Sequence, residues 1–72
     1  MPKPSVRKAC RMADMAMLLR VAWLAIPDLA LLYGVSVRSI RRDLADMQDE
    51  PMRVPLVVDR RRRWHVMTYA RE

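Results

Sequence analysis

The chain has almost none of the residues on which disulfide-bonded domains, zinc sites and phosphate-binding loops depend. Its 72 residues contain one cysteine and one glycine. The single Cys10 excludes an internal disulfide and a cysteine-rich zinc site, so we expect a reducing, cytoplasmic setting. One glycine cannot form a glycine-rich phosphate loop. Paired carboxylates, Ser–His or Cys–His arrangements and metal-ligand spacings are also missing, and we therefore expect neither an enzyme nor a bound cofactor.

A long uninterrupted apolar run is missing as well. Residues 12–26 are nearly all apolar, but Asp14 and Arg20 interrupt them. The run is also shorter than the roughly 20 residues that a membrane span needs. No basic segment followed by an apolar stretch and a small-residue cleavage site marks a secretion signal. We therefore expect a buried helix here and no membrane partner.

Positive charge is what the chain has in excess. Fourteen lysines and arginines stand against eight acidic residues, for a net charge of +6, and all but Lys3 and Lys8 are arginine. Residues 1–26 and 51–72 each carry a net charge of +4, whereas residues 27–50 carry −2. This balance favours an anionic partner. A GC-rich genome is an equal alternative explanation of the preference for arginine over lysine.

Apolar periodicity predicts one small domain, mainly α with a small β-hairpin, in the order α-α-α-β-β. We expect a loose arm over residues 1–5, the folded domain over 6–67 and a tail over 68–72. The first helix should extend from Val6 or Ala9 to Ala25, because Pro27 ends it. The second should span Pro27–Tyr33, with Leu29, Leu32 and Tyr33 inward, and the third should begin at Val37 and end at Met47 or Gln48.

The third helix has two different sides. Gly34, the only glycine, suits the turn before it, and Ser36 is a good N-cap residue. The buried stripe consists of Ile40, Leu44 and Met47. Arg38, Arg41 and Arg42 face outward, whereas Asp43 is expected to be structural and to orient an arginine. A rigid helix of this kind suits a DNA major groove.

The end of the domain reads as a hairpin with a basic loop. Leu56–Val58 and Trp64–Met67 are β-prone, and alternation places Trp64 and Val66 toward the helices. His65 is then an exposed strand residue. The connecting loop carries Arg60, Arg61 and Arg62, with Arg63 at its base. Without a glycine, we expect three to five loop residues.

The motif Leu29-Ala30, Gly34-Val35-Ser36 and Ile40-Arg41-Arg42-Asp43-Leu44 resembles the DeoR-type winged helix-turn-helix of bacterial transcription regulators. Those domains read roughly Leu-Ala-x-x-Phe-Gly-Val-Ser-Arg-x-Thr-Ile-Arg-Arg-Asp-Leu. The match covers about Pro27–Met47. The resemblance implies a three-helix winged helix-turn-helix with a recognition helix over 36–47 and a wing over 59–63.

The chain departs from that pattern in three places. Val37 replaces a residue that is usually basic or polar, so its side chain either contacts a thymine methyl or packs inward. Ser39 replaces threonine. Regulators of this type generally carry an effector-binding domain after the wing, whereas this sequence ends at Glu72, and we expect no small-molecule switch within it.

The sequence therefore predicts a sequence-specific double-stranded DNA-binding protein, a small transcription regulator of the repressor type. The alternative is a protein–protein interaction module, a phage inhibitor or adaptor on the same scaffold. A homodimer through the first helix near Trp23 is expected. Lys3, Arg7, Lys8 and Arg11 either bind phosphate or are simply solvated, and solvation is also the alternative for the arginines of the third helix and the loop. The expected DNA-binding residues are Ser36, Val37, Arg38, Ser39, Arg41, Arg42, Arg60, Arg61, Arg62 and Arg63.

Overall fold

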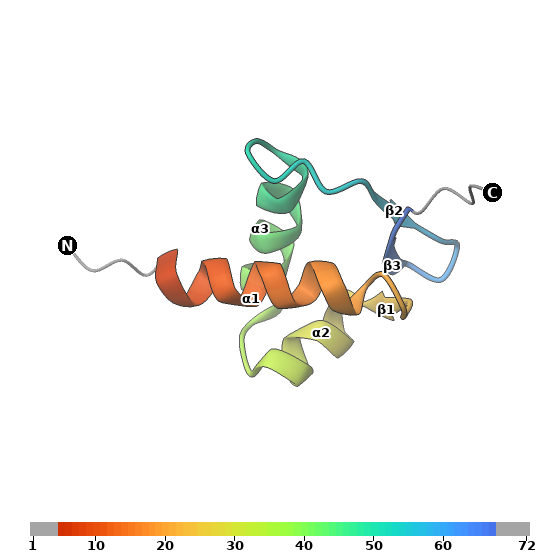
Figure 1. The fold of residues 1–72 in the computed structure, drawn as a ribbon. Helices are drawn as coiled ribbons and strands as arrows, with labels where there is room; N and C mark the ends of the chain where they lie inside the picture. Colours follow the sequence, from red (N-terminus) through yellow and green to blue (C-terminus); the bar gives the residue numbers. More distant parts are fainter. Residues whose placement is uncertain (1–4, 68–72) are drawn as a thin grey trace.

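Three helices and a small antiparallel sheet form the domain in a computed structural model that describes residues 5–67, with side chains from residue 7 onward (Figure 1). The predicted arm, apart from Ser5, and the predicted tail lie outside these residues. The sheet has the strand order β1-β3-β2. This is the mainly helical winged-helix layout that the sequence predicts. The elements are α1 (Ser5–Leu18), β1 (Leu24–Ala25), α2 (Ile26–Tyr33), α3 (Val37–Gln48), β2 (Leu56–Val58) and β3 (Arg63–Val66).

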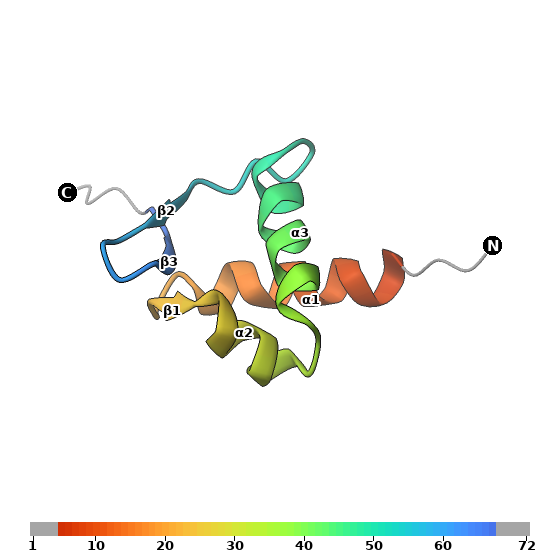
Figure 2. The same cartoon turned by 180° about the vertical axis from the view of Figure 1, so that it is seen from behind.

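The core lies where α1 and α2 pack against α3, and Val66 of β3 joins it. Figures 1 and 2 show α1 stacked on α3 from the two sides, with the sheet at the C-terminal end of α1. The α3 stripe predicted from the sequence is confirmed, since all three of its side chains are buried. The buried apolar side chains are Met15, Leu19, Leu29, Ala30, Ile40, Leu44, Met47 and Val66.

The first helix is shorter than predicted. It ends at Leu18 rather than Ala25, and a hydrogen-bonded turn follows in which Val21 N–H donates to the Leu18 carbonyl at 3.0 Å. Strand β3 accounts for this end, because Val66 N–H donates to the Leu19 carbonyl at 2.9 Å. Pairing with a strand thus replaces the next helical hydrogen bonds, which local helix propensity could not indicate.

Strand β1 is the element that the sequence did not predict. Leu24 and Ala25 pair with Trp64 and Arg63 of β3, so a two-residue strand joins the hairpin to the helical part. Periodicity cannot detect a strand this short. Its consequence is that the hairpin is fixed to the chain segment that enters α2.

The turn between α2 and α3 is confirmed. Gly34 ends α2 with φ 66 and ψ 36, in the left-handed region that glycine adopts readily. The N–H of Val35 donates to the Ala30 carbonyl at 3.0 Å, which closes the end of the helix. A Cβ added at Gly34 would contact nothing within 4 Å. Backbone conformation, rather than a lack of space, therefore favours glycine here.

Helix α2 differs from the prediction at one inward position. Leu29 is buried and Tyr33 is half-buried, but Leu32 is 60% exposed. Around this helix the buried face extends from Leu29 to Ala30 with Tyr33 between them, and Leu32 falls on the far side of Leu29. Tyr33 donates a hydrogen bond from its hydroxyl to Asp14 of α1 at 2.6 Å. Burial, followed by this contact, raises the pKa of Tyr33.

The hairpin faces the core as alternation predicts, except at His65. Val66 is buried and Trp64 packs against the core. His65 is half-buried rather than exposed, because its ring stacks on Trp23 with centroids 4.4 Å apart and its Nδ1 lies 3.0 Å from the Ala22 carbonyl oxygen. The paired positions of β2 and β3 are Leu56 with Val66, Val57 with His65 and Val58 with Trp64.

Candidate nucleic-acid interface

The start of α3 is a capped helix end. Ser36 has extended backbone angles, and its Oγ accepts a hydrogen bond from the Ser39 N–H at 3.0 Å. The Ser36 hydroxyl also donates to Ser39 Oγ at 3.1 Å. The Ser36 hydroxyl thus both accepts and donates at the helix start, whereas Ser39 Oγ only accepts. Val37, which follows the cap, keeps 37% of its surface exposed.

The outer side of α3 presents three exposed arginines. Arg38, Arg41 and Arg42 form no ion pair with any carboxylate in the part of the chain that the structure describes. An arginine without an acidic partner retains its planar set of N–H donors for a phosphate or a guanine edge. This side of the helix is therefore chemically suited to an external anion.

The inner side of α3 carries a buried ion pair. Asp43 is only 1% exposed and receives hydrogen bonds from Arg11 of α1, from Nε to Oδ2 and from Nη2 to Oδ1 at 3.1 Å. Lys8 lies 3.8 Å from Asp43 Oδ1 and pairs with Asp46 Oδ2. The hydrogen bond to Asp43 raises the pKa of Arg11. Asp43 is structural as expected, but the arginine it orients comes from α1.

This arrangement changes the interpretation of the basic first helix. Lys8 and Arg11 are engaged with carboxylates of α3, so they hold the two helices together rather than extend toward an outside phosphate. Arg7 is exposed. Lys3 lies outside the described residues. The ion pairs fix α3 relative to α1, and with it the direction in which the outer arginines point.

The loop between β2 and β3 is held by Asp59. Its Oδ1 accepts hydrogen bonds from the backbone N–H groups of Arg61 at 2.9 Å and of Arg63 at 2.8 Å. Its Oδ2 accepts from Arg63 Nε at 2.8 Å. The Arg63 backbone N–H, with the Arg63 guanidinium after it, lowers the pKa of Asp59. Arg62 turns the chain with a φ of 63, which supplies the left-handed residue in place of a glycine.

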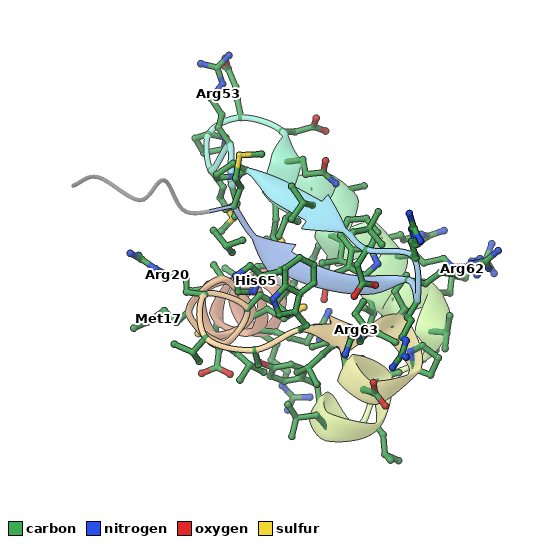
Figure 3. All side chains as sticks on the ribbon, turned by 90° about the vertical axis from the view of Figure 1, so that its right-hand side faces the viewer. Met17, Arg20, Arg53, Arg62, Arg63 and His65 are labelled. Atoms are coloured by element: carbon green, nitrogen blue, oxygen red, sulfur yellow. The ribbon has the colours of Figure 1, made fainter. Side chains whose placement is uncertain are left out.

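Helix α3 and the loop together border one groove of about 430 Å³. Arg41 contributes from α3, and Arg61 and Arg62 contribute from the loop. Figure 3 shows the labelled Arg62 projecting at the outer edge of the molecule, beside the sheet. The remaining lining residues are apolar, and they are Ala25, Ile26, Pro27, Val37, Val58 and Trp64. An arginine rim over an apolar floor is the main geometric feature of this face, which we call the arginine groove.

The predicted site residues fall into groups around this groove. Val37, Arg41, Arg61 and Arg62 border it directly. Arg38, Arg42 and Arg60 are exposed but do not line it, and Ser36 and Ser39 bond to each other. Arg63 belongs to β3 and its guanidinium is paired with Asp59. The ten residues therefore do not act as one uniform basic patch.

Sequence reasoning missed the apolar floor. Pro27 was assigned only to a helix start and Trp64 only to the core, yet both line the groove. The pairing of Leu24 with Trp64 brings these segments together. The four-residue spacing of Val37 and Arg41 was the one visible signal, since such residues share a helix face.

Comparisons of the chain with protein-family models, curated proteins and solved structures give no match. Within residues 5–67, no three His, Cys, Asp or Glu side chains lie together in a way that would hold a metal ion. None of the helices in that range is long and apolar enough to cross a bilayer. The functional argument therefore rests on the arginine groove and the sequence motif.

Proposed function

We propose that this protein is a small transcription regulator of the repressor type that binds double-stranded DNA in a sequence-specific way. Helix α3 would enter the major groove, and the loop between β2 and β3 would act as a wing on the adjacent backbone or minor groove. The observation that carries this proposal is the arginine groove, in which Arg41, Arg61 and Arg62 come from two separate elements. The net charge of +6 supports it.

Two physical features favour DNA over a generic anion. Arg41 lies on a helix whose start is capped by Ser36 and whose inner side is held by Arg11, so the backbone position of Arg41 is defined. An arginine carried at a fixed position on a helix can form the bidentate contact to guanine O6 and N7. Arg61 and Arg62 lie on a turn, where contacts to the sugar–phosphate backbone need less exact placement.

A titration of DNA affinity against salt tests the proposal. Five to eight phosphate contacts give a log–log slope of roughly −5 to −7, because each contact releases condensed counterions. Selection of bound sequences from random duplex DNA supplies the site for this titration. A slope near zero, or the absence of any selected sequence, would contradict the proposal. Co-purification in a fixed ratio with another protein, without any DNA shift, would favour a protein-binding module instead.

The proposal includes a homodimer that forms near Trp23. Met17 is 71% exposed, Val21 is 82% exposed and Trp23 is 41% exposed, so large apolar side chains gather where α1 ends. Figure 3 shows Met17 and Arg20 on the side of the view opposite Arg62. A second copy at this position would leave the arginine groove open. Two-fold related subunits favour half-sites about one helical turn apart.

Sedimentation equilibrium tests the dimer. The parent protein should reach the dimer mass, and Val21→Asp should reduce it to the monomer because the substitution places a charge in the contact. Arg20→Gln is the matched control, since it changes charge in the same region but leaves the apolar surface. A monomer at all concentrations, both with and without DNA, would contradict this part of the proposal.

A further inference from the structure

We infer that Val37 reads the methyl group of a thymine in the major groove, beside the guanine or phosphate held by Arg41. This inference rests on the proposed function and specifies one position of the DNA site. It starts from the exposure of Val37, an apolar side chain in the first turn of α3 that keeps 37% of its surface in solvent.

The polar side chains beside Val37 take part in the helix cap, so Val37 is the apolar side chain that this end of the helix offers to a base. Ser36 and Ser39, the hydroxyl residues of the helix start, bond to each other and to the backbone. The Ser36 hydroxyl both donates and accepts within the cap, and Ser39 Oγ accepts from it, so both side chains are held at the cap and neither carries a methyl-sized apolar group for a base edge. Val37 and Arg38 are the remaining side chains at the N-terminal end of the helix, which is the part that contacts base edges when such a helix lies in the major groove.

Apolar side chains lie on both sides of Val37. It lines the arginine groove together with Pro27 and Val58. It also lines a second hollow of about 370 Å³, whose other walls are Pro27, Ala30, Leu31, Gly34 and Val35. Val37 thus belongs to the walls of two neighbouring hollows, and its exposed surface is open to a base edge. In the major groove, thymine is the base that carries a methyl group there.

The spacing within α3 fixes where this thymine should lie. Val37 and Arg41 both line the arginine groove and are four residues apart, so they lie on one helix face, separated by about 6 Å along the axis. Successive bases on a strand are about 3.4 Å apart. The thymine should therefore lie within about two base pairs of the position that Arg41 contacts.

The experiment removes single methyl groups from the DNA. In the selected site, each thymine is changed in turn to deoxyuridine, which lacks only the methyl group, and Kd is measured at constant salt. One thymine per half-site should weaken binding by about fourfold when its methyl is removed, the effect of exposing one methyl-sized group. Val37→Ala should bind the parent site with a similar loss and should no longer respond to deoxyuridine at that position.

Controls separate this inference from the proposed function. Leu32→Ala shortens another exposed aliphatic side chain, which lines neither hollow and is not part of the proposed dimer contact, and it should retain the full response to deoxyuridine. Thermal melting of both variants confirms that they fold. If the protein binds its DNA site but no thymine responds, or if Val37→Ala responds like the parent, the inference is wrong while the proposed function stands. If no sequence is bound at all, the proposed function itself fails.

Discussion

The two sides of α3 use arginine in opposite ways. On the inner side, Arg11 of α1 donates two hydrogen bonds to the buried Asp43. On the outer side, Arg41 borders an open groove and pairs with no carboxylate within the described residues. The same guanidinium chemistry therefore holds the helix in one case and is left available to an outside anion in the other.

The difference follows from where the acidic residues lie. Asp43 and Asp46 lie one turn apart on the side of α3 that meets α1, where Lys8 and Arg11 pair with them. The acidic groups thus neutralise the basic groups of α1 rather than those of α3. The net charge alone cannot distinguish the basic residues that are paired with carboxylates from those that are left open to an outside anion.

The largest effect is expected from a substitution that disrupts the ion pair on the inner side of α3. Arg11→Ala should lower the free energy of unfolding by about 3 kcal/mol, because it leaves a buried carboxylate without its main partner. A 72-residue domain has little stability to lose. Chemical denaturation measures the change. A joint Arg11→Met and Asp43→Leu variant should recover much of the loss, since it removes both charges together. A loss below about 0.5 kcal/mol for Arg11→Ala would show that the pair does not hold the fold.

The second prediction concerns a substitution that removes an arginine from the outer side of α3 and leaves the ion pair on the inner side intact. Arg41→Ala should weaken binding to the selected DNA site by about 1–3 kcal/mol and relax specificity at one base pair. Its free energy of unfolding should stay within about 0.5 kcal/mol of the parent, because the side chain is exposed. Arg20→Ala is the matched control, with the same loss of charge outside the groove. Equal losses of affinity in the two variants would mean that Arg41 contributes only its positive charge and makes no specific contact in the arginine groove.

The sequence predicted the local features of α3 better than the long-range contact on its inner side. The spacing of Gly34, Ser36 and Ile40 determines a turn, a cap and a buried stripe within a few residues, and the structure has all three. The partner of Asp43 lies 32 residues away in the chain. A contact at that distance depends on how α1 crosses α3, which local patterns do not contain.

The sheet also shows that local features are predictable and long-range contacts are not. The strands of the hairpin follow from alternation and β-prone residues, and they are confirmed. Strand β1 and the early end of α1 depend on hydrogen bonds from β3, including the bond from Val66 N–H to the Leu19 carbonyl. An apolar run such as residues 12–26 fits either a continuing helix or a turn and a strand, and only the tertiary contacts decide between them.

The third prediction compares two arginines with the same unusual backbone. Arg62 has a φ of 63 in the loop at the arginine groove, and Arg53 has a φ of 45 in the connection after α3. Figure 3 shows the two side chains at separate edges of the molecule. Glycine at either position removes one charge and relieves a left-handed residue, so neither substitution should lower stability by more than about 0.5 kcal/mol.

Only one of these two substitutions should affect DNA binding. Arg62→Gly should weaken binding to all sequences alike and make the log–log salt slope shallower by about 0.9, the value for one lost phosphate contact. Arg53→Gly should leave the slope unchanged, since its exposed side chain lies 3.5 Å from Glu50 and outside the groove. If the two variants shift the slope equally, the loop is not a wing that contacts DNA.

The smallest expected effect concerns the one carboxylate that lies within the loop. The hydrogen bonds from Arg63 make the pKa of Asp59 lower in the folded protein than its ordinary value of 3.8. The contribution of Asp59 to loop order should therefore be complete above that value and should be lost as pH falls through the lowered pKa. Below the lowered pKa, protonation of Asp59 weakens the ion pair and releases the guanidinium of Arg63.

Amide hydrogen exchange at Arg61 and Arg63 should quicken relative to unstructured peptides as the pH falls through the lowered pKa, whereas Asp59→Asn should show the same protection above and below that pH. Protection that stays constant in the parent down to complete protonation would mean that the charge of Asp59 does not hold the loop, and that Arg63 is as available to an outside anion as Arg41.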